Sequence, residues 1–251
     1  AFWRTGLCAL LLAPSVSRVA WRDLAWMAAA GLFLAAHFWV WFLSLEHISV
    51  MRSVVLVTLT PLWVGLAEWA IDGHAPTRLF WTGVGIALGG VGLMSWSGLG
   101  EASLLGDLLA LAGGWLGSAY FLVGRKVRQR VQFAPYGAFV CGFAALWLLI
   151  VALARDLPML GWSWPIWGAL VGMAALPQLV GHVGFNFALR YVPASLIATL
   201  ILLEPVGATV LAALVLDEWP GRLELAGGGV ILLGVLVATR TAPAPAAPAP
   251  S

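Results

Sequence analysis

Nine apolar runs occupy most of this sequence and constrain its fold more than any other feature. They cover residues 2–16, 24–45, 49–71, 78–97, 104–124, 133–154, 164–190, 193–216 and 221–239. Most approach the length of about 20 residues that an α-helix needs to cross the ~30 Å hydrocarbon core of a bilayer. Charged residues make up only 10% of the chain, against about 25% in a typical soluble protein. The sequence therefore predicts an all-α polytopic membrane protein with short loops.

Basic residues in the loops predict the orientation of the chain. If the nine runs alternate across the membrane, nine of the 13 lysines and arginines fall on one side and four on the other. The four are Arg4, Arg52, Arg155 and Arg222. Cytoplasmic loops carry the excess of basic residues, so the side that holds residues 125–130 and the C-terminus is predicted to be cytoplasmic. The net charge of +2 is too small to indicate a nucleic-acid partner.

A repeat with an offset of 144 residues relates the first half of the chain to its end. The matched pairs include Leu56 with Leu200, Leu59 with Leu203, Pro61 with Pro205, Gly83 with Gly227, Gly85 with Gly229 and Gly90 with Gly234. The two copies lie five runs apart, and this odd displacement means that they cross the membrane in opposite directions. Inverted repeats are typical of secondary transporters. Because the second copy has five runs and the first has four, we expect a further helix before residue 1 and an open groove beside runs 2–16 and 24–45.

Two stretches of the second half carry a more specific pattern. The first is Gly106-Asp107-Leu108-Leu109-Ala110-Leu111 with Trp115, Tyr120 and Arg125. The second is Glu204-Pro205, followed by Leu216-Asp217-Glu218 and the glycines of 227–234, and it is matched in the first half by Thr60-Pro61 and the glycines of 83–92. These motifs resemble the opening and closing helices of the repeats in the drug/metabolite transporter superfamily, in particular its EamA-type exporters with ten helices.

The resemblance implies an inverted repeat of five plus five helices, of which this chain would hold four plus five. Residues 1–97 would form the first EamA-like repeat, without its first helix, and residues 104–239 the second, followed by a disordered Ala/Pro tail over 241–251. It also implies a multi-pass protein of the bacterial inner (plasma) membrane. Such a protein is a secondary transporter that exports small metabolites (amino acids or related compounds) or drug-like molecules by alternating access. Its partners would be a small-molecule substrate, the lipid bilayer and, as a candidate coupling ion, the proton, with no cofactor.

Polar side chains inside the apolar runs are the candidate substrate-binding residues. Gln178, His182 and Asn186 are spaced i, i+4, i+8 and so share one helix face. Glu204 lies near the middle of its run, where a charged side chain usually faces a bundle interior or a wet cavity. The full set is His37, Trp41, Thr60, Trp115, Gln178, His182, Asn186 and Glu204. Uncharged donors and acceptors suit a small zwitterion or amphipathic amine, because no Arg or Lys is expected at mid-depth.

Each of these features also has a purely structural interpretation. Glu204 would then be a neutral acid bonded to a neighbouring helix, and the polar stripe would serve interhelical hydrogen bonds. An intramembrane enzyme, a lipid-linked head-group flippase component and a non-transporting scaffold are alternatives, although no enzyme or metal-site motif stands out. Cys8 and Cys141 are expected to be buried free thiols. The pairs Gly85 with Gly89, Gly113 with Gly117 and Gly168 with Gly172 are candidate positions for close helix contact.

Overall fold

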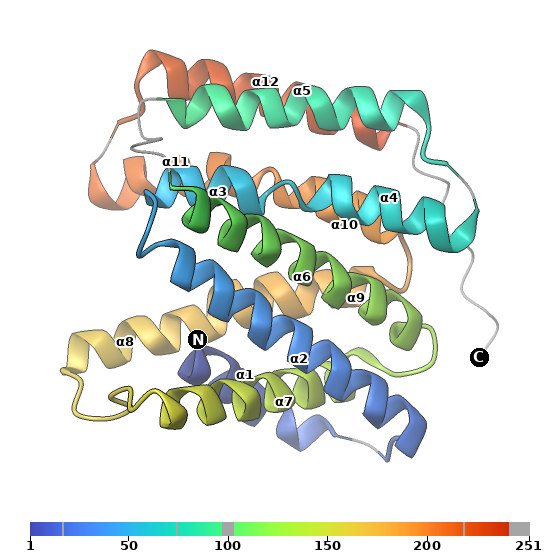
Figure 1. Ribbon diagram of the computed structural model, residues 1–251, viewed down its shortest axis with the longest axis vertical. Helices are drawn as coiled ribbons and strands as arrows, with labels where there is room; N and C mark the ends of the chain where they lie inside the picture. The colour runs from blue at the N-terminus through green and yellow to red at the C-terminus, as the bar shows by residue number, and fades with distance from the viewer. Residues whose placement is uncertain (17, 74, 97–102, 218, 241–251) are drawn as a thin grey trace. The chain divides into compact units, whose positions relative to one another are not determined.

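The computed structural model describes residues 1–16, 18–73, 75–96, 103–217 and 219–240, and all the secondary structure in these ranges is helical (Figure 1). The elements are α1 (Phe2–Leu12), the 3-10 turn η1 (Ala13–Ser15), α2 (Trp21–Ser44), α3 (Val50–Val57), α4 (Thr60–Asp72), α5 (Arg78–Met94), α6 (Leu104–Arg128), α7 (Phe133–Ala154), α8 (Trp164–Met173), the π-helical segment η3 (Ala174–Val183), α9 (Gly184–Ala188), α10 (Ala194–Ile201), α11 (Glu204–Leu216) and α12 (Arg222–Thr239). The predicted tail over 241–251 and Glu218 lie outside the described residues.

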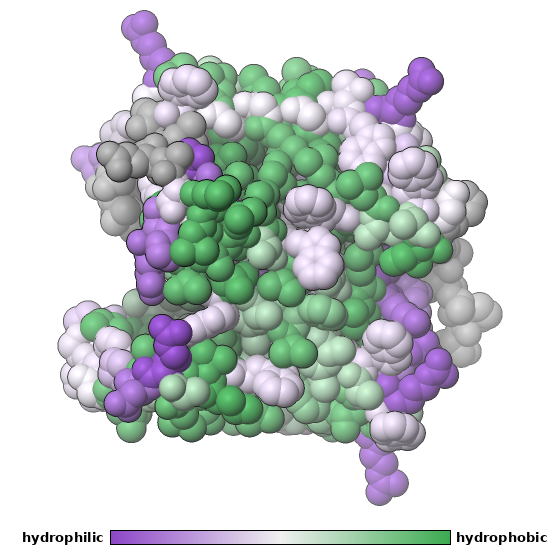
Figure 2. Space-filling view, viewed as in Figure 1, coloured by the Kyte–Doolittle hydropathy of each residue, from purple (hydrophilic) through white to green (hydrophobic). Residues whose placement is uncertain are grey.

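Each of the nine apolar runs corresponds to one helical segment. Seven segments of the described chain are long and apolar enough to cross a membrane, and α1 and α5 are shorter apolar helices. Three of the segments are built from consecutive helices, namely α3–α4, α8–η3–α9 and α10–α11. Hydrophobic side chains dominate the helix surfaces visible in Figure 2. The prediction of an all-α multi-pass membrane protein is confirmed.

The chain packs into two compact units that cut across the predicted repeats. Unit 1 holds Ala1–Trp39 and Ala119–Arg190, and unit 2 holds Val40–Ser118 and Tyr191–Ser251. Helices α2 and α6 each contribute one end to each unit. Because each unit takes helices from both halves of the chain, the two units do not correspond to the two predicted repeats. The repeat boundaries at 97 and 104 remain a prediction.

Helix boundaries in unit 2 follow the 144-residue offset. Helices α3 and α4 begin at Val50 and Thr60, and α10 and α11 begin at Ala194 and Glu204. Both segments are broken at the same place, over residues 58–59 and 202–203, just before the matched prolines. Proline has no N–H to donate to the carbonyl four residues earlier. In the first copy the Thr60 hydroxyl donates to the freed carbonyl of Val57 (2.8 Å).

Helices α5 and α12 form the closest helix contact of unit 2, and they run antiparallel side by side (Figure 1). A Cβ atom placed on Gly83 would lie 2.6 Å from the carbonyl oxygen of Gly234, and one on Gly227 would lie 2.7 Å from that of Gly90. Adding 144 to Gly83 gives Gly227, and subtracting 144 from Gly234 gives Gly90, so the two contacts exchange under the repeat. This reciprocity is the geometry of an inverted repeat, and it confirms the predicted opposite orientation of the two copies.

The glycines that bring these helices together are not the ones that four-residue spacing predicts. Gly83 and Gly90 are seven residues apart, as are Gly227 and Gly234. The predicted pairs Gly85 with Gly89 and Gly168 with Gly172 face open space, with no atom within 4 Å of an added Cβ. Those two pairs are therefore wrong as contact motifs, because two helix turns separate successive contacts of α5 with α12.

Unit 1 is built on an antiparallel pair formed by α1 and α7. Gly6 and Ala9 of α1 lie against Ala145 and Gly142 of α7. The segment α8–η3–α9 packs against α1 and contains Pro177 within its π-helical stretch. Since proline cannot donate the regular helical hydrogen bond, it favours the wider π geometry there.

Helix α6 continues to Arg128, four residues beyond the predicted end at 124. The reason is that Arg128 is buried, with 2% of its surface exposed. Its Nε donates to the carbonyl oxygen of Asn186 (2.8 Å), and its Nη1 donates to that of Val131. Arg128 therefore satisfies carbonyl groups near two segment ends and is part of the unit 1 interior rather than a loop charge.

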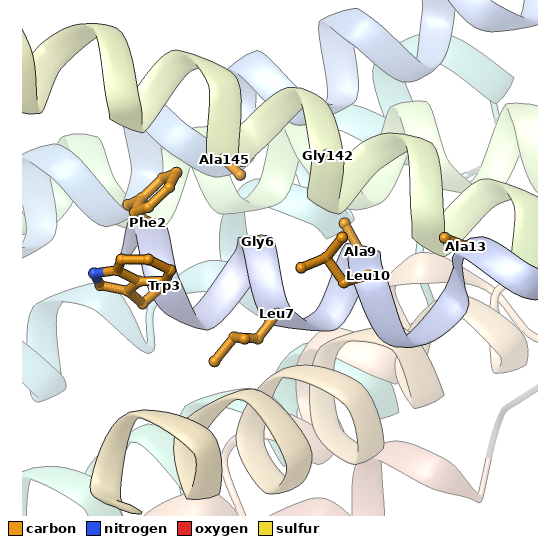
Figure 3. Close-up of a pocket in the computed structure, with 9 residues that line it drawn as sticks. All are labelled: Phe2, Trp3, Gly6, Leu7, Ala9, Leu10, Ala13, Gly142 and Ala145. Carbon is orange, nitrogen blue, oxygen red and sulfur yellow. The ribbon is translucent and has the colours of Figure 1, made fainter. Parts of the chain in front are cut away.

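A shallow groove of about 380 Å³ runs along α1 and α7 (Figure 3). Its lining consists of Phe2, Trp3, Gly6, Leu7, Ala9, Leu10, Ala13, Gly142 and Ala145. The indole Nε1 of Trp3 donates to the Met159 carbonyl (2.9 Å), so the groove offers little but apolar surface. Such a lining suits hydrocarbon rather than a polar substrate. The groove expected beside α1 and α2 is a different one and remains a prediction.

Candidate functional site

The interior of unit 1 contains a buried cation. Arg4 of α1 is only 6% exposed, and its Nε donates to Oε1 of Gln178 (2.8 Å). The guanidinium carbon lies 4.5 Å from the centre of the Phe38 ring, within the range of a cation–π interaction. Gln178 is fully buried, and its Nε2 lies 3.5 Å from Sγ of Cys141.

Arg4 lies close to the middle of the membrane-spanning part of unit 1. Cys8 contacts Cys141, the ninth of the 22 residues of α7. Arg4 is one turn, about 6 Å, further along α1, and Gly6 between them packs against Ala145. Two sequence-based expectations are therefore wrong, because Arg4 is neither a loop charge nor absent from mid-depth. Because Arg128 is buried as well, the count of basic residues that supports the orientation becomes eight against three.

The stripe predicted on run 164–190 faces this interior. The His182 ring lies 5.5 Å from the Phe38 ring and 6.2 Å from the Tyr120 ring. One turn later, the amide nitrogen of Asn186 donates to the His182 carbonyl (2.8 Å) and to the hydroxyl of Tyr120. We call the set Arg4, Gln178, His182, Asn186, Tyr120 and Tyr136 the polar column.

Three atoms of the polar column are buried and have no hydrogen-bond partner among the described residues. They are Nδ1 of His182, Oδ1 of Asn186 and the hydroxyl oxygen of Tyr136. The last two meet at Gly124 of α6, where an added Cβ would lie 3.2 Å from Oδ1 and 2.9 Å from the hydroxyl. A buried polar atom without a partner costs about 1–3 kcal/mol. These atoms are therefore places where a ligand or a water molecule would restore a hydrogen bond.

The backbone of the column is unusual as well. Gln178 and His182 both belong to η3, the ten-residue π-helical segment that contains Pro177. π-helical insertions are rare and occur frequently at functional sites. The same proline that interrupts the regular hydrogen bonding thus determines how these two side chains are presented.

The eight predicted site residues divide equally between the two units. His37, Gln178, His182 and Asn186 belong to unit 1, and His37 is buried with its ring 5.0 Å from that of Phe38. The other four, Trp41, Thr60, Trp115 and Glu204, belong to unit 2. The structure thus brings the predicted stripe together within unit 1, and the binding role of all eight residues remains a prediction.

The predicted site residues of unit 2 are less buried than those of unit 1 or form hydrogen bonds with nearby parts of the chain. Trp115 is 56% exposed, and the side chain of Glu204 is exposed at the start of α11. The Thr60 hydroxyl donates a hydrogen bond to the Val57 carbonyl. Ser44, one turn after Trp41, donates to the Trp41 carbonyl (2.6 Å), and its hydroxyl lies 2.7 Å from that of Ser53.

Sequence reasoning missed Arg4, Tyr120, Tyr136 and the buried carboxylate of Glu68. A single arginine within the first apolar run was the available signal for Arg4. Glu68 of α4 is 7% exposed, and its two oxygens accept hydrogen bonds from the backbone N–H groups of Ala194 (2.9 Å) and Ser195 (3.3 Å). These are free donors at the start of α10, where a carboxylate is favourable. The described residues contain no group of three or more His, Cys, Asp or Glu placed to hold a metal ion.

Comparison with known proteins agrees with this architecture. An "uncharacterized transporter" of Archaeoglobus fulgidus is 25% identical over 249 residues, which is 95% of this chain and 81% of the relative. The "uncharacterized transporter YwfM" of Bacillus subtilis is 26% identical over 241 residues, 92% of this chain and 80% of the relative. A solved crystal structure shares the fold with a TM-score of 0.79 at 22% identity, covering 96% of this chain and 85% of that one. Residues 1–96 and 104–240 both match the EamA-like transporter family, and the chain belongs to that family.

Proposed function

We propose that this transporter exports small zwitterionic metabolites, such as amino acids or related compounds, across the bacterial inner membrane by secondary, alternating-access transport. The observation that carries the proposal is the polar column at mid-depth of unit 1. Ionisable groups inside a membrane bundle are costly and generally mark substrate or ion pathways. A set of six polar side chains from α1, α6, α7 and the α8–η3–α9 segment, three with an unpaired atom, exceeds what helix packing needs.

The chemistry of the column favours a substrate with both charges. Arg4 supplies a buried positive charge, and an arginine fork matches a carboxylate. The amide oxygen of Asn186 can only accept a hydrogen bond, so it requires a donor such as an ammonium group. A zwitterion meets both requirements, whereas the amphipathic amine considered from the sequence meets only the second. Phe38 and His182 offer ring surfaces between the two ends.

The inverted repeat supports alternating access. In transporters of this kind two related parts of the chain rock around a central site. Here the chain passes between the units within α2, within α6 and at residues 190–191, so relative movement of the units would act on these three connections. A proton is the proposed coupling ion, with Glu204 as the proposed carrier. The excess of basic residues in the loops on the side of the C-terminus supports a cytoplasmic C-terminus in this proposal.

An export assay tests the proposal directly. Cells that express the full gene are loaded with a panel of labelled amino acids, amines and organic anions, and efflux is compared with that of cells lacking it. We expect efflux of one or more zwitterions to depend on the gene, and Arg4→Gln to abolish it. Arg130→Gln, which removes an equal charge from an exposed ion pair, is the matched control. Efflux confined to amines or to neutral compounds, or unaffected by Arg4→Gln, would contradict the proposal.

A further inference from the structure

The two cysteines of the chain meet in the interior of unit 1. Cys8 of α1 and Cys141 of α7 are 133 residues apart in sequence, and their sulfur atoms lie 3.7 Å apart. Cys8 has no exposed surface, and 2% of Cys141 is exposed. Both are free thiols, as the sequence predicts. Their proximity was not predicted, because it depends on the antiparallel register of α1 and α7.

The helix pair around them has the spacing that a disulfide needs. A Cβ on Gly6 would lie 3.7 Å from the Cβ of Ala145, and one on Gly142 would lie 3.9 Å from that of Ala9. Disulfides join residues whose Cβ atoms are about 3.5–4.5 Å apart. Cys8 and Cys141 lie within this same stretch of the interface. Rotation of the two side chains therefore suffices to close the gap to the roughly 2.05 Å of an S–S bond, without separating the helices.

Two neighbouring groups partly offset the cost that burial imposes on a thiolate at this pair. The Gln178 amide nitrogen lies 3.5 Å from the Cys141 sulfur, and Arg4 lies one turn from Cys8 on α1 while bonding to the same Gln178. A thiolate, rather than a thiol, is the nucleophile in disulfide chemistry, and nearby cations and hydrogen-bond donors stabilise it.

We propose that Cys8 and Cys141 form a reversible disulfide when the protein meets a peroxide. One thiolate attacks a peroxide oxygen, the O–O bond breaks, and a sulfenic acid and one water molecule result. The second thiolate attacks the sulfenic sulfur, the S–S bond forms, and the remaining oxygen leaves as a second water. The two thiol protons end in the two water molecules, and the cysteines together lose two electrons to the peroxide.

The disulfide would connect the redox state of the chain to the polar column. As the sulfur of Cys141 turns toward Cys8, it leaves the amide nitrogen of Gln178, whose oxygen holds Arg4. The bond would also fix α1 to α7. This inference does not depend on the proposed substrate or direction of transport, because it concerns only the two thiols and their neighbours.

The experiment counts thiols in the full chain reconstituted in lipid nanodiscs. The protein is treated with hydrogen peroxide, quenched, denatured and labelled with maleimide-polyethylene glycol, which adds one band shift for each free cysteine. Because the chain has two cysteines, we expect two labels before oxidation, none after it, and two again after dithiothreitol. Tryptic digestion without reductant should then give peptide 5–18 joined to peptide 131–155, with the summed mass reduced by two hydrogens.

Two controls make the result decisive. The variants Cys8→Ala and Cys141→Ala each keep one thiol, so neither can give the linked peptide, and any label lost to a sulfenic acid should return with dithiothreitol. The double variant Gly6→Cys with Ala145→Cys, made without the native cysteines, places a second cysteine pair at the same interface. The peroxide concentration that links this pair is the concentration at which the native pair is tested. If the native pair keeps both labels at that concentration, or loses them without recovery by dithiothreitol and without the linked peptide, the proposal is overturned.

Discussion

The two compact units use the same repeat differently. In unit 2, the helix boundaries of both copies agree at the 144-residue offset, and the core between α5 and α12 is apolar. That core contains Ala87, Val91, Met94, Leu202, Ile231 and Val235. In unit 1, α2 is one unbroken helix of 24 residues, whereas its counterpart α8–η3–α9 is interrupted by a π-helical segment.

The difference extends to the side chains. The positions 144 residues before Gln178 and His182 are Leu34 and Phe38, both buried and apolar. The polar column thus lies where one copy departs from the other, and the close helix packing lies where the copies agree. We infer that symmetry serves the scaffold in unit 2 and that its loss in unit 1 created the candidate site. The predictions below test this contrast.

The largest effect should come from the glycine contact of unit 2. In Gly234→Ala, the new Cβ would lie 2.3 Å from the backbone nitrogen of Ala87 and could not be accommodated by side-chain motion. Overpacking of a core costs about 1–3 kcal/mol or more, so we expect this variant to lose its monodisperse folded peak in size-exclusion chromatography. By the repeat, Gly90→Ala should behave alike.

The control for this prediction is on the same helix as Gly90. Gly85→Ala adds a methyl group where no atom lies within 4 Å, so its chromatographic profile and melting temperature should match those of the parent protein. Equal damage from Gly85→Ala and Gly90→Ala would mean that general helix effects, and not the two-fold contact, determine stability here.

A smaller but still large effect should come from a substitution beside Arg4, the cationic residue of the polar column. Gln178→Leu removes the acceptor of the Arg4 Nε–H and leaves that buried donor without this bond. Hydrogen bonds to charged groups contribute about 1.5–3 kcal/mol, which corresponds to a roughly 10- to 100-fold loss of substrate affinity if Arg4 binds the substrate. Transport assays and thermal melting measure the two effects separately. Gln132→Leu, at an exposed position without a capping bond, should change neither.

These two cases show what the sequence could predict. The helical segments follow from the apolar runs, because a membrane protein must bury its backbone polar groups in helices. The breaks at residues 58–59 and 202–203 follow from Pro61 and Pro205, and the antiparallel copies follow from the odd displacement of the repeat. Which glycines touch does not follow, since it depends on the crossing point of α5 and α12 and not on spacing within either helix.

The candidate site was predictable only on one helix. Gln178, His182 and Asn186 were identified by their spacing, but Tyr120 and Tyr136 come from other helices and join them only through packing. Arg4 and Arg128 look like surface charges because each lies near the end of an apolar run. The structure buries both, since each finds an oxygen acceptor inside unit 1.

At the Asn186 end of the polar column, two variants can distinguish a role in substrate binding from a role in helix packing. Asn186→Ala removes the unpaired Oδ1 together with the donor to the Tyr120 hydroxyl, whereas Tyr120→Phe removes only that hydroxyl. If Oδ1 accepts from the substrate's ammonium group, Asn186→Ala should weaken binding at least about tenfold, as expected for loss of a hydrogen bond to a charged group. Tyr120→Phe should weaken it less, with similar melting temperatures. Equal binding losses in a transport titration would assign Asn186 a packing role.

The matched positions Thr60 and Glu204 compare the two copies at their proline breaks. If Glu204 carries the coupled proton, Glu204→Gln should remove the pH dependence of export, because an amide does not titrate. Thr60→Val, which loses only the bond to the Val57 carbonyl, should leave that dependence intact. Export measured across a pH series decides between the two. An unchanged pH response in a folded Glu204→Gln variant would make Glu204 structural and end the coupling proposal.

The smallest effects should come from two ion pairs, one in each unit. In unit 2, Arg52 of α3 donates to both oxygens of Asp107 (2.6 and 2.8 Å). In unit 1, Arg130 reaches Asp23 through two nitrogens that share one oxygen (3.1 and 2.7 Å). The Arg130 side chain is 44% exposed and the Arg52 side chain 25%. Water and salt screen exposed pairs more strongly, so such pairs contribute about 0–1 kcal/mol.

The two-oxygen geometry of the unit 2 pair should make it the stronger one, since paired parallel hydrogen bonds hold a carboxylate better than a shared oxygen does. Asp107→Asn should therefore lower the melting temperature slightly more than Asp23→Asn, and both differences should shrink in high salt. Double-mutant cycles with Arg52→Gln and Arg130→Gln isolate each pair from its neighbours. The coupling energy of Arg130 with Asp23 in unit 1 should therefore be smaller than that of Arg52 with Asp107 in unit 2. The opposite result would mean that the ion pair of unit 2 does not share the stabilising role that we infer for the helix packing of that unit.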